Sequence, residues 1–73
     1  MEDKRKICEL LLQTLQATDK GRDIVSLEYY TNEFTDDAHV DVTYAYGYIK
    51  RVDVTADSGF AMIRDIIDKI SRI

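Results

Sequence analysis

The spacing of hydrophobic and polar positions changes along the chain, and each change predicts an element. Residues 2–17 and about 58–72 carry apolar side chains at three- and four-residue spacing, which is typical of amphipathic helices. Three segments between them alternate apolar and polar positions as half-buried strands do, namely 24–31, 39–46 and 48–54. The predicted element order is therefore α-β-β-β-α.

The ends of the helices are marked by capping residues. Glu2 and Asp3 suit the N-terminus of the first helix, and Gly21 suits the turn after its end. Asp57 or Ser58 is expected to cap the second helix. We interpret this strand-to-helix turn as a cap and not as a phosphate site, because the glycine-rich phosphate motifs are missing.

The parity of the valines constrains the turn between the last two strands. Even-numbered positions stay apolar on both sides of Gly47. A loop with an odd number of residues pairs even positions with even ones and keeps the valines on one face. We therefore expect a hairpin loop of three or five residues, such as Tyr46–Tyr48, with Gly47 relieving the tight geometry.

These elements assemble most simply into an α+β domain of residues 1–73, in which a three-stranded antiparallel sheet carries two helices on one face. The covered face is expected to carry Val25, Leu27, Val40, Val42, Val52 and Val54. The other face would carry Ser26, Glu28, Tyr30, His39, Asp41, Thr43, Arg51 and Asp53. One-sided antiparallel sheets commonly leave such a polar face in water.

Charge and composition narrow the function classes. The net charge is −4, and residues 23–57 hold most of the acidic residues but only Lys50 and Arg51 as cations. This balance argues against direct nucleic-acid binding, which needs a basic surface. No apolar run approaches the roughly 20 residues that span a bilayer, so no membrane partner is expected. The single cysteine, Cys8, fits a reducing compartment, and we expect a cytoplasmic protein.

Candidate catalytic and metal-binding residues are few. Cys8 lies on the apolar stripe of the first helix, which predicts a buried structural thiol. The lone His39 lacks an evident partner group for general-base chemistry. Asp37, His39 and Asp41 share one strand face and could hold a divalent ion, but a solvated strand edge is the commoner arrangement. The sequence predicts no enzyme, no metal site and no cofactor.

Five tyrosines are many for a chain of this length. Tyr29 and Tyr44 are expected in the core, and Tyr30, Tyr46 and Tyr48 at the surface. Exposed tyrosine beside acidic residues is typical of protein-binding surfaces. Ordinary strand preference for aromatic residues explains the same pattern, and both interpretations remain open at this point.

Size, acidity and element order together resemble small phage-encoded inhibitors of bacterial defence of the anti-CRISPR type. The resemblance implies that acidic residues stand in for phosphates against a basic partner, here Glu28, Glu33, Asp36, Asp37, Asp41 and Asp53. The element order also resembles the double-stranded RNA-binding domain. That family has a basic cluster at the start of its last helix, where this chain has residues 57–63, so the residues that would contact RNA are absent.

The leading hypothesis is a non-enzymatic interaction protein that binds a basic protein surface, with a nucleic-acid-mimicking inhibitor as its sharpest form. The expected partner is a basic, nucleic-acid-handling protein. The predicted partner-binding residues are Glu28, Tyr30, Glu33, Asp36, Asp37, Asp41, Tyr46, Tyr48 and Asp53. The alternative is a structural homo-oligomer, a homodimer through Ile66, Ile70 and Ile73 of the Ile-rich second helix. An enzyme built around His39 ranks third.

Overall fold

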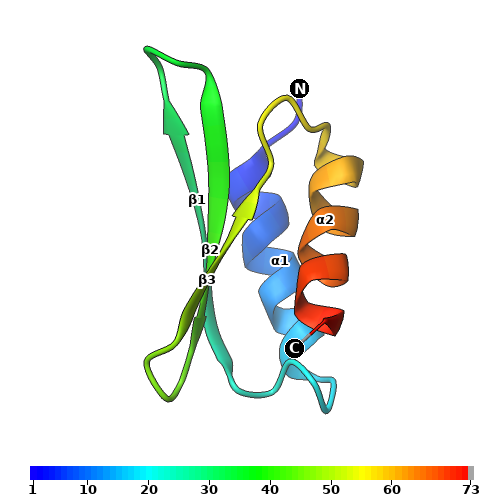
Figure 1. Ribbon diagram of the computed structural model, residues 1–73. Helices are drawn as coiled ribbons and strands as arrows, with labels where there is room; N and C mark the ends of the chain where they lie inside the picture. The colour runs from blue at the N-terminus through cyan, green and yellow to red at the C-terminus, as the bar shows by residue number, and fades with distance from the viewer. Residues whose placement is uncertain (73) are drawn as a thin grey trace.

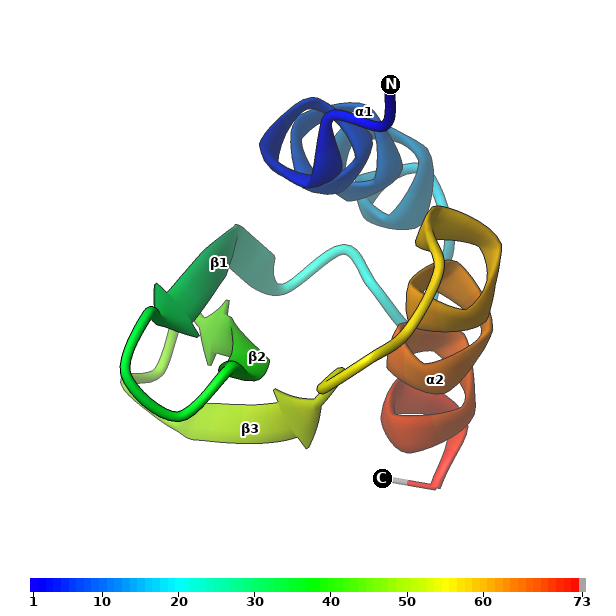
Figure 2. The same ribbon diagram turned by 90° about the horizontal axis from the view of Figure 1, so that it is seen from above.

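The computed structural model describes residues 1–72, and its elements follow the predicted α-β-β-β-α order (Figure 1). The sheet is antiparallel with strand order β1-β2-β3. Seen from above, both helices lie on one side of the sheet, with α1 over β1 and α2 towards β3 (Figure 2). The α+β prediction is confirmed. The elements are α1 (Lys4–Gln16), β1 (Ile24–Asn32), β2 (Asp37–Tyr44), β3 (Ile49–Asp53) and α2 (Gly59–Ser71).

One hydrophobic core lies between the sheet and the two helices. Val40 and Val42 are completely buried, and Cys8 and Tyr44 are buried beside them, as the sequence predicts. Ile66 of α2 is also completely buried in this core. Tyr29 is only partly buried and packs against the edge of this core. Each large aliphatic side chain buried here stabilises the fold by about 1.5–3 kcal/mol relative to an exposed position.

The start of β1 differs from the prediction. Val25 was expected to face the helices, but it is 51% exposed, and Ile24 is completely buried instead. The pairing with β2 shifts register between Ile24 and Ser26, which is the signature of a β-bulge. The extra residue lets Ile24 and Leu27 both face the core although they are three positions apart. Simple alternation along the sequence does not reveal this shift.

The hairpin between β2 and β3 has the predicted odd length. Tyr44 donates its backbone N–H to the carbonyl of Tyr48 at 2.8 Å, so the loop consists of the three residues 45–47, one position earlier than expected. Gly47 has φ +91°, a conformation that L side chains rarely adopt. Its position after a tight turn is that of a three-residue loop closed by a left-handed residue. Val40 and Val52 consequently pair on the covered face.

Capping side chains fix the starts of both helices. Asp3 caps α1 by accepting the N–H of Lys6 at 3.0 Å, and Ser58 caps α2 by accepting the N–H of Ala61 at 3.1 Å. Helix α1 therefore begins at Lys4 and not at residue 2. Within residues 1–72, neither helix combines the length and the apolar character needed to cross a membrane.

The apolar residues of α2 divide between core and surface. Ile66 and Ile70 are buried inside the domain, so they form its own core and are not offered to a second chain. Ile73, the third residue of the predicted dimer face, lies outside the described residues. The large apolar residues that α2 does expose are Phe60, at 86%, and Ile67, at 46%.

Candidate protein-interaction surface

The uncovered face of the sheet has a charged row at its centre. Glu28 on β1 lies opposite Asp41 on β2, and Asp41 lies opposite Arg51 on β3. Arg51 donates its Nε–H to Asp41 Oδ1 at 3.1 Å, and His39 Nε2 lies 3.7 Å from the same oxygen. The Asp41 side chain is only 18% exposed as a result. Asp41 therefore organises this face, while Glu28 presents its charge to solvent.

A second row across the same face combines aromatic and acidic groups. The rings of Tyr30 and His39 stack with centroids 5.2 Å apart, and Asp53 lies opposite His39 on β3. The Tyr30 hydroxyl donates to Glu28 Oε2 at 2.6 Å, and this bond raises the pKa of the phenol. Hydrogen bonds from the Thr55 hydroxyl and backbone N–H lower the pKa of Asp53. Tyr30 thus stays protonated and Asp53 ionised at neutral pH.

The hairpin between β1 and β2, residues 33–36, continues this face at one end of the sheet (Figure 1). Asn32 holds its start, because the side-chain Oδ1 accepts the N–H of Phe34 at 3.0 Å and the carbonyl accepts that of Thr35 at 3.3 Å. Asp36 closes the turn at φ 58°, a left-handed conformation that Asp tolerates better than most residues. The loop is thus held by its own hydrogen bonds.

An aromatic side chain stands at the tip of this hairpin. Phe34 is 98% exposed, and Glu33, Asp36 and Asp37 around it are also exposed. Sequence reasoning missed Phe34 as a functional residue because it interrupts a polar connection and belongs to no periodic pattern. The available signal was a lone large apolar residue inside an acidic turn, which contributes nothing to the core.

We use the name acidic surface for the carboxylates of the open face and this hairpin, which are Glu28, Glu33, Asp36, Asp37, Asp41 and Asp53. The pairing of the strands places them on contiguous positions, because Asp37 opens β2 directly beside Asn32 and the hairpin. Arg51 is the one lysine or arginine on the open-face positions of the described strands. Six of the nine predicted partner-binding residues thus form one surface, and Tyr30 lies within it.

The other two predicted tyrosines lie elsewhere. Tyr46 and Tyr48 belong to the β2–β3 hairpin, at the opposite end of the sheet from Phe34 (Figure 1). They cluster with the buried Tyr44, whose ring centroid lies 5.4 Å from that of Tyr46 and 5.8 Å from that of Tyr48. The cluster packs the end of the core, so these exposed rings do not extend the acidic surface.

The geometry offers little to a metal ion or to nucleophilic catalysis. Across residues 1–72, no three His, Cys, Asp or Glu side chains lie close enough together to hold a metal. The Asp41 carboxylate, which the sequence offered as a ligand, contacts Arg51 instead. Burial raises the pKa of the Cys8 thiol, which keeps the group protonated and unreactive. The chemistry of this surface is therefore that of charge and hydrogen bonding.

Comparisons with models of protein families, with curated proteins and with solved structures find no match for the chain.

Proposed function

We propose that this chain is a non-enzymatic interaction protein that binds a basic protein surface through its acidic surface. The observation that carries the proposal is the continuity of carboxylates from the open sheet face onto the β1–β2 hairpin. Arg51 is the one lysine or arginine on the open-face positions of the described strands, and Lys4 of α1 lies near the hairpin carboxylates on the helix side. A concentrated negative field of this kind attracts cationic partners and disfavours anionic ones.

A basic protein groove that normally holds nucleic acid is the partner with the best electrostatic match. Such a groove is lined by Lys and Arg that contact phosphates. Carboxylates fixed on a sheet and a hairpin can occupy those contacts without the entropic cost of ordering a flexible tail. In this form the protein acts in the cytoplasm as a nucleic-acid-mimicking inhibitor, in keeping with its resemblance to small phage-encoded proteins.

Phe34 adds an apolar contact at the centre of the acidic hairpin. Its side chain is 98% exposed although it would gain hydrophobic stabilisation from burial in the core. Aromatic residues are enriched among the few that dominate binding energy in protein interfaces. Phe34 is therefore the anchor of the proposed interface, and its carboxylate neighbours set orientation and association rate.

A paired affinity capture tests the proposal. The wild-type protein and the variant E33Q/D36N/D37N are immobilised and exposed to bacterial lysate at low and high salt. The proposal predicts that wild type retains a basic nucleic-acid-handling protein at low salt, and that double-stranded DNA competes for it. The hairpin variant should lose this capture, because the exposed carboxylates of the hairpin are gone.

The matched control removes the same number of carboxylates elsewhere. The variant E9Q/D19N/D68N neutralises exposed acids on α1, the following turn and α2, none of which belongs to the acidic surface. It should capture the same protein as wild type. Equal losses in both variants would show that only the net charge matters, and equal capture by all three would remove Glu33, Asp36 and Asp37 from the binding site.

Self-association is the second candidate function, and the exposure of Phe60 and Ile67 on α2 favours it. Residues seven positions apart lie on the same flank of a helix. Two copies could bury this flank against each other. Light scattering from purified protein at high micromolar concentration distinguishes the two functions. A dimer that F60S/I67S converts to monomer supports self-association, and a wild-type monomer rejects it.

A further inference from the structure

Strand β1 is an edge strand, and the backbone pairing shows which of its groups point outwards. In a strand, successive residues direct their N–H and C=O groups to opposite sides. Tyr44 donates its N–H to Tyr48, next to β3, whereas Ala45 donates to the carbonyl of Asp23, next to β1. Even-numbered residues of β2 therefore bond towards β3, and odd-numbered ones towards β1.

The register between β1 and β2 shows which residues of β1 bond towards β2 and which point outwards. Its residues opposite odd-numbered β2 positions are even-numbered, because Glu28 pairs with Asp41 and Tyr30 with His39. The N–H and C=O groups of Leu27, Tyr29 and Thr31 consequently point away from the sheet. These outward N–H and C=O groups form no hydrogen bond within residues 1–72, because the β1–β2 ladder uses the even-numbered residues of β1. They form an unpaired edge along the regular part of β1.

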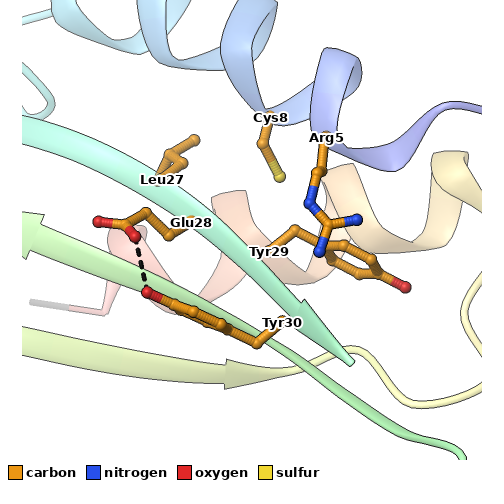
Figure 3. A pocket seen from close by; sticks show the side chains of 6 residues that line it. All are labelled: Arg5, Cys8, Leu27, Glu28, Tyr29 and Tyr30. Carbon is orange, nitrogen blue, oxygen red and sulfur yellow. Dashed lines mark hydrogen bonds between the residues drawn. The ribbon is translucent and has the colours of Figure 1, made fainter. Parts of the chain in front are cut away.

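A cavity of about 350 Å³ runs along this edge, next to α1 (Figure 3). The cavity is lined by the four consecutive residues 27–30 of β1 and by Arg5 and Cys8 of α1. Successive side chains of a strand point to opposite faces. A single cavity that touches four consecutive residues must therefore lie along the edge of the strand and give access to its backbone.

Two of the usual protections of an edge strand, proline and lysine, are missing along this segment, which carries Glu28 and lies beside α1. The chain contains no proline, and β1 contains no lysine. The bulge of β1 lies at its start, before Leu27, and leaves the rest of the strand regular. Natural proteins normally protect exposed edges with such devices because an open edge pairs readily with another chain.

We propose that β1 binds an extended segment of a partner protein as a fourth strand, and that this segment alternates basic and apolar residues. The proposal rests on the proposed function and adds the form in which the partner is recognised. Main-chain hydrogen bonds to Leu27, Tyr29 and Thr31 supply affinity, and the two faces of the edge select the side chains.

The two sides of the edge differ in charge, and this difference defines the segment. On the open face, an added strand lies beside Glu28, whose carboxylate accepts only neutral hydroxyl donors among the described residues 1–72. On the helix side it meets Leu27 and Arg5, whose guanidinium lies 5.5 Å from the centre of the Tyr29 ring (Figure 3). A lysine or arginine therefore suits the open side, and a neutral apolar residue the side next to Arg5.

An acetylated eight-residue peptide of alternating lysine and valine is a direct probe. Amide hydrogen exchange of the isotope-labelled protein is measured with and without the peptide. At a peptide concentration of about ten times Kd, the outward amides of Leu27, Tyr29 and Thr31 should exchange roughly tenfold more slowly. A peptide of alternating glutamate and valine should give no protection.

The variant Thr31→Pro removes one outward N–H and keeps the inner ladder, since proline is tolerated where an edge N–H faces solvent. It should weaken binding of the lysine–valine peptide, and Thr31→Val, which keeps the N–H, should not. The wild-type exchange pattern decides the question even if the proline variant does not fold.

Three results overturn the inference: no peptide binding, equal protection by the glutamate peptide, or binding without protection of these amides. The last result would still leave the acidic surface as a binding site, so the two proposals fail separately. Protection that grows with protein concentration alone would identify a second copy of this chain as the occupant and reject a basic partner segment.

Discussion

Glu28 and Asp41 lie directly opposite each other on β1 and β2, so two carboxylates share the centre of the open sheet face. Like charges in this arrangement are destabilising. Arg51 forms an ion pair with Asp41 at 3.1 Å, and Glu28 has no ion pair within residues 1–72. A role of Glu28 in binding explains why an exposed carboxylate that lowers the stability of the fold stands at the centre of this face.

Removing the charge of Glu28 should therefore stabilise the fold. Glu28→Gln keeps an oxygen that accepts the Tyr30 hydroxyl and ends the repulsion from Asp41. The free energy of unfolding should rise by about 0.2–1 kcal/mol, measured by urea denaturation at low salt. The gain should shrink in high salt, because screening already weakens the repulsion. A loss of stability would show that the Glu28 carboxylate is held for structural reasons.

Phe34 should matter for binding and not for folding. Its side chain is 98% exposed, so Phe34→Ala should change the free energy of unfolding by less than about 0.5 kcal/mol. Loss of an aromatic anchor should weaken partner binding by about 2 kcal/mol, roughly 30-fold. Titration calorimetry against the captured partner measures this loss. An unchanged affinity would exclude the hairpin tip from the interface.

Asp53 should contribute to acid sensitivity. Bonds from Thr55 lower its pKa below the ordinary value of 3.8 in the folded state. The stability from this group is therefore present above pH 3.8 and is lost as the pH falls through the folded pKa. Asp53→Asn should flatten that part of the stability–pH curve, measured by thermal unfolding from pH 2 to 6. An identical acid dependence in the variant would contradict this origin.

Asp57 should act in the opposite direction. The neighbouring Asp65 carboxyl, together with burial, raises the pKa of Asp57 above its ordinary value of 3.8. The folded state thus binds this proton more tightly than the unfolded state, and stability falls as the pH rises from 3.8 through the raised pKa. Asp57→Asn should remove that fall, so that the variant gains stability relative to wild type above the window. A variant that loses stability with rising pH as wild type does would reject this role of Asp57.

Most of the fold could be predicted from the sequence because its signals are local. Periodicity identified all five elements, and the parity of the valines around Gly47 correctly predicted an odd hairpin loop. The bulge at Ile24–Ser26 could not be predicted, because it depends on how β1 pairs with β2. Alternation alone placed Val25 in the core, where Ile24 lies.

The surface was less predictable than the core. Strand parity correctly grouped Glu28, Tyr30 and Asp41 on the open face. Sequence gave no way to see that Arg51 and His39 shield Asp41, because that depends on the register of three strands. The exposure of Phe34 depends on a hairpin that leaves the body of the domain, and no periodic pattern encodes it.

The affinity of the captured basic partner for the two triple variants tests the central claim most directly. Removing the hairpin carboxylates in E33Q/D36N/D37N should weaken binding about tenfold, since three exposed pairs each contribute about 0.5 kcal/mol. The control E9Q/D19N/D68N, with the same net charge, should bind within about twofold of wild type. Equal affinities for wild type and the hairpin variant would contradict the claim that carboxylates continuing from the sheet onto the hairpin bind the partner.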